Sequence, residues 1–336
     1  MISNILSGFG LSTVSVNLEV CARDRHESDK HDSPFVYLSS NPDEVLDLPR
    51  ELEVLELNSD YTGEKYHPSL EKLYEQISQL PNLHTLDVYG CLNFSDKEFK
   101  YLSGLKNLKV LNVFRCNVEG SGLSFLPDSI EKLNVRVMPE YLHLLKRFSR
   151  LELFQPCGRA LQPECMKLIA QCTQLKELII DGHGRGMFTD ESAEHLPAFK
   201  QLESLTIYHS TNFFHEGLEH VAKIDSLKNL VLNMLPIGKK GISHLSSCLN
   251  LESLKIISCG DYEDESINDE SIGSLSVLPS LKKLEISNLD FTSNIFSVLS
   301  EFPALKDVTI EAYFDNATKL QGKNWGKSQG VNIEYK

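Results

Sequence analysis

The sequence predicts an α/β solenoid, in which a parallel sheet of short strands lines one face and helices cover the other. A six-residue phrase occurs eleven times: a leucine-like residue, two variable residues, a second leucine-like residue, one variable residue and a third leucine-like residue. The copies begin at Leu52, Leu83, Leu108, Ile130, Phe148, Leu175, Leu202, Leu227, Leu251, Leu281 and Leu305. Their spacings run from 18 to 31 residues with a mean near 25, a period typical of stacked repeats.

The coil from residue 83 to residue 107 shows how one repeat is built. Side chains alternate along a strand, so the three leucine-like residues are expected to point inward and the residues between them outward. Cys91, at the ninth place counted from the start of the phrase, then turns the chain. The segment Ser95–Glu98 is a capping box that begins a helix, and apolar residues follow at helical spacing. The predicted unit is strand, turn, short helix and return.

No single coil can bury its apolar edge alone, so neighbouring coils must stack. The phrase, the helical half of each repeat and the cysteines at the ninth place together resemble the leucine-rich-repeat superfamily. The nearest branches are the cysteine-containing and ribonuclease-inhibitor-like repeats. The resemblance implies a horseshoe with a parallel concave sheet and convex helices.

Three regions are expected along the chain. Residues 1–45 form an N-terminal cap that contains a strand, because apolar residues alternate from Val14 onward. Residues 46–313 hold about eleven leucine-rich repeats. Residues 314–336 form a C-terminal cap with a last edge strand, and Trp325 is expected to close the core there.

Composition narrows the class of function. The chain has 33 basic and 47 acidic residues, a formal charge of −14, which argues against nucleic acid and is compatible with a protein partner of basic or mixed surface. No apolar run is long enough for a membrane span, and no signal peptide is recognised. The eight cysteines fit buried, reduced positions rather than a disulfide framework. We therefore expect a cytoplasmic monomer.

The candidate binding residues lie at the seventh place of the phrase, where side chains point away from the core. A partner-binding patch is predicted on the concave face from Tyr89, Phe114, Arg136, Phe154 and Tyr208, with Arg115 and His209 beside it. Tyrosine, phenylalanine and arginine are residue types that anchor protein contacts. The alternative is that the rings lie flat along neighbouring strands and stiffen the sheet.

Catalytic, metal and cofactor sites are not expected. His215 and His220 are one residue too far apart for the zinc motif in which two histidines share a helix face. The acidic loop 260–270 could hold calcium or a basic partner, but a solvated loop before a helix is the favoured interpretation. The glycine-rich segment 181–188 lacks the strand-to-helix context of a phosphate loop and is expected to be a connector.

These observations predict a non-catalytic protein-recognition module that binds a partner on its concave face. The chain is similar in style to leucine-rich-repeat effectors that bacterial pathogens deliver into host cells, which implies a host protein as partner. One alternative is a substrate-receptor subunit of a ubiquitin ligase. A further alternative is a GTPase activator, since one leucine-rich-repeat family has that activity.

Overall fold

The computed structural model describes residues 13–17, 35–37, 48, 50–58, 70–91, 94–156, 158–182, 187–260, 266–289, 291–312 and 314–335. The chain divides into two compact units, Met1–Leu151 and Glu152–Lys336, which we call the N-terminal and C-terminal units.

The N-terminal unit contains one parallel sheet. Its strands are β1 (Thr13–Asn17), β2 (Phe35–Tyr37), β3 (Val54–Asn58), β4 (Thr85–Tyr89), β5 (Val110–Asn112) and β6 (Lys132–Asn134). They lie in the order β2-β1-β3-β4-β5-β6. The strand predicted around Val14 is confirmed as β1, which pairs with β3 along its whole length.

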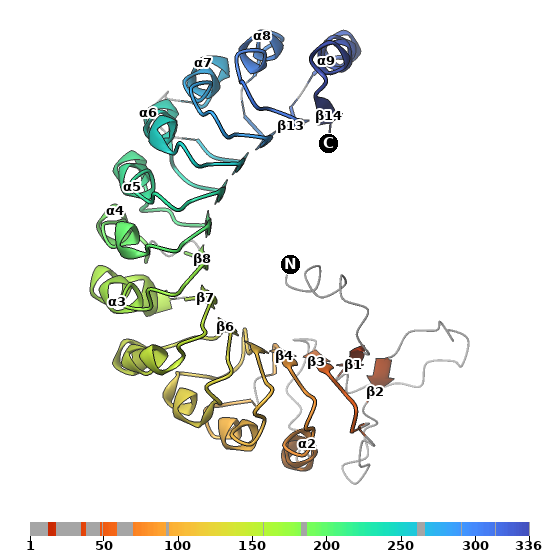
Figure 1. Ribbon diagram of the computed structural model, residues 1–336, viewed down its shortest axis with the longest axis vertical. Coiled ribbons are helices and arrows are strands. Elements are labelled where there is room, and N and C mark those ends of the chain that lie inside the picture. The colour runs from red at the N-terminus through yellow and green to blue at the C-terminus, as the bar shows by residue number, and fades with distance from the viewer. Residues whose placement is uncertain are drawn as a thin grey trace. The chain divides into compact units, whose positions relative to one another are not determined.

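Helices cover one face of this sheet (Figure 1). They are α2 (Leu70–Ile77) and the 3-10 helices η1 (Glu98–Leu102), η2 (Ser121–Phe125) and η3 (Pro139–Arg147). Only 22 residues separate the phrases that begin at Leu108 and Ile130. Within this repeat the helical segment is the five-residue 3-10 helix η2, a form common in short connecting segments.

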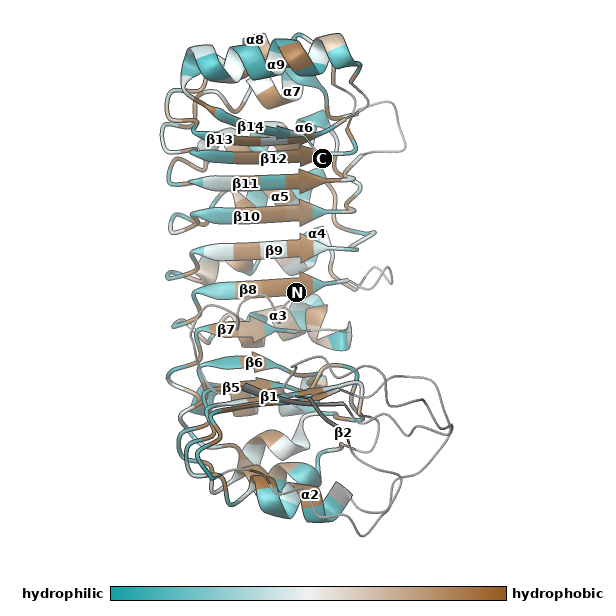
Figure 2. Ribbon diagram, turned by 90° about the vertical axis from the view of Figure 1, so that its right-hand side faces the viewer, coloured by the Kyte–Doolittle hydropathy of each residue, from teal (hydrophilic) through white to brown (hydrophobic). Residues whose placement is uncertain are grey.

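The C-terminal unit repeats the same plan more regularly. Its strands are β7 (Leu153–Gln155), β8 (Glu177–Asp181), β9 (Ser204–Tyr208), β10 (Asn229–Asn233), β11 (Ser253–Ile257), β12 (Lys283–Ser287), β13 (Asp307–Glu311) and β14 (Asn332–Tyr335). They are parallel and follow chain order, side by side as Figure 2 shows. The last edge strand predicted near the C-terminus is confirmed as β14, which pairs with β13.

The helices of the C-terminal unit lie on the outer side of its strands (Figure 1). They are η4 (Gly158–Leu161), α3 (Pro163–Ile169), α4 (Asp190–Ala193), η5 (Leu196–Ala198), α5 (His215–Val221), α6 (Lys239–His244), η6 (Leu245–Ser247), α7 (Asp269–Gly273), α8 (Ile295–Leu299) and α9 (Asn316–Gln329). In α9, Trp325 contacts the ring of Phe296 at 6.0 Å between centroids, and its Nε1 donates to Ser300 Oγ at 2.8 Å.

The core of each unit lies between its strands and its helices. Leucine-like residues of the phrase are buried from Leu52 to Leu305, with exposures of 8% or less. Because each strand pairs in parallel with the next and each coil returns through a helix, the fold class predicted from the sequence is confirmed: an α/β leucine-rich-repeat solenoid.

One repeat boundary was predicted wrongly. Phe154 pairs with Leu178, which is the second leucine-like residue of its own phrase. The fifth repeat therefore begins at Leu151 and not at Phe148. The corrected spacing from Ile130 is 21 residues, and the next spacing is 24 residues, so the repeats are more regular than the sequence alone indicated.

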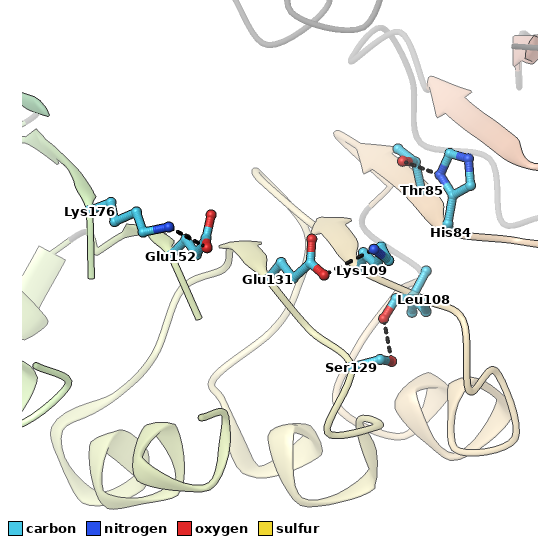
Figure 3. Close-up of polar contacts among 8 residues, drawn as sticks. All are labelled: His84, Thr85, Leu108, Lys109, Ser129, Glu131, Glu152 and Lys176. Atoms are coloured by element: carbon cyan, nitrogen blue, oxygen red, sulfur yellow. Dashed lines mark hydrogen bonds and ion pairs between the residues drawn. The ribbon is translucent and has the colours of Figure 1, made fainter. Parts of the chain in front are cut away.

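Charged side chains line the second place of the phrase, just before each strand. In the C-terminal unit, glutamate and lysine alternate here, and the pairs are Glu152–Lys176, Glu203–Lys228 and Glu252–Lys282, at 2.7, 3.0 and 2.7 Å. In the N-terminal unit, Lys109 pairs with Glu131 at 3.0 Å. Figure 3 shows Glu152–Lys176 and Lys109–Glu131. Such exposed pairs contribute little to the free energy of folding, about 0–1 kcal/mol each.

The two loops discussed above lie partly outside the described residues. Residues 261–265 of the acidic loop and residues 183–186 of the glycine-rich segment are not described. The helix predicted to follow the acidic loop is α7, where the side chain of Asn268 accepts from the backbone N–H of Ser271 at 3.1 Å.

Candidate functional site: an aromatic and arginine patch

Two aromatic rings meet at the ends of neighbouring strands in the N-terminal unit. Tyr89 is the last residue of β4, and Phe114 follows β5 at the same place of the next phrase. Their ring centroids are 6.1 Å apart, with 33° between the ring planes. Both side chains are half-buried. The sequence placed these residues on one face, and the structure brings them into contact.

Arg115 covers these two rings. Its guanidinium carbon lies 5.6 Å from the centroid of Tyr89 and 5.8 Å from that of Phe114, within the range of a cation–π interaction. Its backbone has φ 59°, in the left-handed region that non-glycine residues seldom adopt. This conformation directs the exposed side chain of Arg115 back over the strand ends.

The left-handed backbone is a property of the eighth place in the phrase. Besides Arg115, the residues with positive φ at this place are Gly90, Gly158, His209, Met234, Ser258 and Asn288, with Gly158 counted from the corrected start at Leu151. There the chain leaves the strand, and the backbone N–H reaches the next coil. For example, Gly90 N donates to the carbonyl of Phe114 at 3.0 Å, and His209 N donates to that of Asn233 at 3.1 Å.

Arg136 continues the row on the next coil. β5 and β6 pair with Asn112 opposite Asn134, and the same register places Arg136 beside Phe114, about 4.8 Å away along the sheet. The Arg136 side chain is exposed, and its Nη2 lies 4.0 Å from the sulfur of Met138. The patch of the N-terminal unit is therefore Tyr89, Phe114, Arg115 and Arg136.

A carboxyl group lies beside this patch at the fifth place of the phrase. The Asn112 side-chain amide donates to both carboxylate oxygens of Asp87, at 3.0 and 2.9 Å. Burial raises the pKa of Asp87 to about 6, although the bond from Asn112 opposes the rise and the charge of Glu56 adds to it. This carboxyl is therefore held partly desolvated in the centre of the sheet face.

Tyr208 and His209 form a separate cluster in the C-terminal unit. Their rings meet edge to face, with centroids 5.2 Å apart. The side-chain amide of Gln155 donates to the Tyr208 hydroxyl at 3.1 Å. His209 Nδ1 is 3.5 Å from the buried carboxylate of Asp181, and His209 Nε2 is 3.1 Å from the sulfur of Met234.

Phe154 does not belong to a surface patch, contrary to the prediction. Its side chain is 0% exposed, because the corrected register turns it inward at the position that Leu178 occupies on the next strand. The outward seventh place of this repeat is instead residue 157, which lies outside the described residues.

Sequence reasoning missed Asp87, Asn112, Asp181 and Met234. The polar residues of this set face the sheet surface at the fifth or seventh place, and only the fold shows which partners they meet. One signal of this left-handed backbone is present in the sequence, because Gly90 stands at the eighth place, and Gly158 does so in the register that begins at Leu151. Glycine is the residue that most easily adopts positive φ, so its recurrence there indicates a special backbone position.

The described residues offer no metal centre or reactive thiol. They contain no group of three or more histidine, cysteine, aspartate or glutamate residues that could hold a metal. Burial raises the pKa of Cys91 and of Cys116 to about 12, so both thiols stay protonated at neutral pH. Cys116 Sγ contacts the carbonyl of Val88 at 2.9 Å, which places it in the turn between two coils.

Among known proteins, one solved structure with a TM-score above 0.5 supports the fold. No family model and no curated protein matches the chain. Among solved structures, the chain is similar to yeast Rad7 in its complex with Elc1, with 19% identity, a TM-score of 0.51, and coverage of 78% of this chain and 70% of that one. It is also similar to an internalin, InlF, from Listeria monocytogenes, with 16% identity, a TM-score of 0.41, and coverage of 80% and 82%.

A search for membrane-crossing segments gave a negative result. In the part of the chain that the structure describes, every helix is too short or too polar to span a bilayer.

Proposed function

We propose that this chain is a non-catalytic recognition module that binds another protein through the sheet face of its repeats. The observation that carries this proposal is the contact of Tyr89, Phe114 and Arg115 at the strand ends of the N-terminal unit. Aromatic rings stacked with an arginine are rigid, amphipathic and enriched at the centres of protein interfaces. Tyr208 and His209 are proposed as a second contact region, on the C-terminal unit.

The contact between the rings also bears on the alternative that they only stiffen the sheet. Rings that serve packing alone gain most when they are fully buried, as Phe94 and Phe99 are at 0% exposure. Tyr89 and Phe114 instead keep part of each ring in solvent, beneath an exposed arginine. That arrangement favours a contact surface over a purely structural role.

The test is capture of a partner from lysate by immobilised wild-type protein and by two variants. We expect the Tyr89→Ala/Phe114→Ala variant to lose a partner that wild type retains. The matched control is Phe125→Ala, because Phe125 is an aromatic residue of the same unit that is 49% exposed and lies in η2, on the helix side. If folded Tyr89→Ala/Phe114→Ala protein captures the same partners in the same amounts, the proposed patch is wrong.

A substrate-receptor subunit of a ubiquitin ligase is the second candidate. Such a subunit must hold a substrate on its repeats and a second protein elsewhere, and the Rad7 structure is itself a complex with another protein, Elc1. A cullin adaptor among the captured proteins, retained by the Tyr89→Ala/Phe114→Ala variant, would favour this role. Capture of a small GTPase would favour the activator alternative. Delivery into a host cell as a pathogen effector, and a cytoplasmic location, stay predictions.

A further inference from the structure

Arg115 and Arg136 differ from Lys109 and Arg147, two basic side chains of the N-terminal unit that pair with carboxylates. Lys109 pairs with Glu131 at 3.0 Å, and Arg147 pairs with Asp128 at 3.0 Å. Among the described residues, no carboxylate lies within ion-pair distance of Arg115 or Arg136. In a chain with 47 acidic and 33 basic residues, two adjacent arginines without a carboxylate form a local cationic site.

The geometry leaves the guanidinium groups able to bind an anion. Arg115 lies over two rings, a contact that holds the guanidinium near them without using its N–H donors. Arg136 lies on the other side of Phe114 in the strand register. A planar guanidinium donates two parallel hydrogen bonds to a carboxylate, and pre-ordering by the rings reduces the entropy lost when it binds.

The residues around the two arginines also indicate which kind of partner side chain would lie next to the bound anion. Phe114 lies between the two cations, and Tyr89 extends the apolar surface away from Arg136. A partner segment that carries an acidic residue next to an aromatic or aliphatic residue would meet both features. Asp87 lies two residues before Tyr89 on the same strand, and its carboxylate would repel an acidic side chain placed deeper in the sheet face.

We propose that the patch recognises an acidic protein segment, whose carboxylates bind Arg115 and Arg136 while an adjacent apolar side chain packs on Phe114 and Tyr89. This inference rests on the proposed recognition function and adds the chemistry of the partner. It differs from the expectation, based on the net charge of the chain, that the partner is basic or mixed.

The experiment is selection of a displayed library of random 12-residue peptides on the full chain, with measurement of the affinity of the selected peptides by fluorescence anisotropy. We expect peptides with net negative charge and at least one aromatic or aliphatic residue beside the acid. Their affinity should fall at least tenfold for Arg115→Asn/Arg136→Gln. Asparagine is used at position 115 because it tolerates the left-handed backbone.

The matched control is Lys146→Gln/Arg150→Gln, which removes the same charge from two exposed residues of the same unit. This variant should keep the wild-type affinity within about twofold, since screening limits distant exposed charges. A variant with both arginines changed to lysine should recover part of the affinity, because the charge returns without the planar fork. Equal losses in the control and in the arginine variant would overturn a specific role for Arg115 and Arg136.

Other outcomes of the selection distinguish a failure of the acidic-partner proposal from a failure of the proposed binding patch itself. Selected peptides that are neutral or basic and that require Tyr89 and Phe114 would overturn the acidic partner and leave the patch in place. Selected peptides that bind Tyr89→Ala/Phe114→Ala as well as wild type would overturn both. A 12-nucleotide oligouridine probe that binds the two arginines more tightly than any selected peptide would assign the site to nucleic acid instead.

Discussion

Phe154 stands opposite Leu178 in the parallel pair of β7 and β8. Both side chains are 0% exposed, so the phenylalanine fills a place in the core that a leucine occupies one coil later. This pairing sets the start of the fifth repeat at Leu151 and separates Phe154 from the surface patch.

The first prediction concerns the difference between two phenylalanines. Phe154→Ala should lower the free energy of unfolding by about 3–5 kcal/mol, because it removes a fully buried ring and leaves a cavity. Phe114→Ala should cost about 1 kcal/mol, since it removes a partly exposed ring and one aromatic contact. Urea unfolding of the two variants measures both values. Equal losses would contradict the inward position of Phe154.

The second prediction concerns the pH dependence that Asp87 imposes on stability. Its folded pKa of about 6 lies above the unfolded value of 3.8, so the folded state binds more protons between these values. The contribution of Asp87 therefore becomes less favourable as pH rises from about 4 to about 6, and it is constant above that window. At neutral pH, this shift lowers the free energy of unfolding by about 3 kcal/mol relative to its value below the unfolded pKa.

Asp87→Asn removes this titration and leaves an oxygen that can accept from Asn112. We expect the variant to gain stability relative to wild type at pH 7.5, by about 2 kcal/mol more than at pH 4.0. Urea unfolding of both proteins at the two pH values measures the difference. A difference between variant and wild type that does not change with pH would show that Asp87 is not perturbed by burial.

The third prediction concerns a glycine inside a helix. Gly217 lies in α5, where alanine normally stabilises a helix. A Cβ at this position would come within 2.3 Å of Phe213 Cε2 and within 2.5 Å of Asp190 Oδ1. Asp190 cannot move freely, because this oxygen accepts from the backbone N–H groups of Phe214 and Gly217, both at 2.8 Å.

Gly217→Ala should therefore lower the melting temperature, with a stability loss of about 2 kcal/mol from overpacking. The control is Gly104→Ala, where no atom lies within 4 Å of the added Cβ. That variant should be neutral or slightly stabilised, because alanine restricts the unfolded chain. A gain in stability for Gly217→Ala would show that α5 packs less closely on Asp190 and Phe213.

The fourth prediction concerns thiol reactivity. Burial raises the pKa of Cys91, Cys116 and Cys248 to about 12, and that of Cys259 to about 11. The thiolate is the reactive form, so these residues should resist iodoacetamide at pH 7.5 in the native protein and react after denaturation in guanidinium. Mass spectrometry of the digested protein locates the labelled sites. Rapid native labelling of Cys91 would indicate that its turn opens readily.

The sequence by itself determined the fold class and most of the residues that fill the core, with Phe154 as an exception. The repeat has a period near 25 residues, and each phrase has three leucine-like residues. Such repeats can bury these residues only by stacking on neighbouring repeats, and this requirement does not depend on which residues occupy the other places. Tyr89, Phe114 and Arg115 were placed on the surface by the same pattern, because side chains alternate along a strand.

Only the tertiary structure decided the register of the irregular repeat and the contacts of the outward side chains. Phe148 and Leu151 both fit the phrase, because either start places a large apolar residue, Leu151 or Phe154, opposite Leu178. Only the strand pairing shows that this residue is Phe154. The position of Arg115 over two rings depends on a left-handed backbone that a turn between coils imposes. Such contacts join residues on different coils, and local sequence pattern carries no information about their distances.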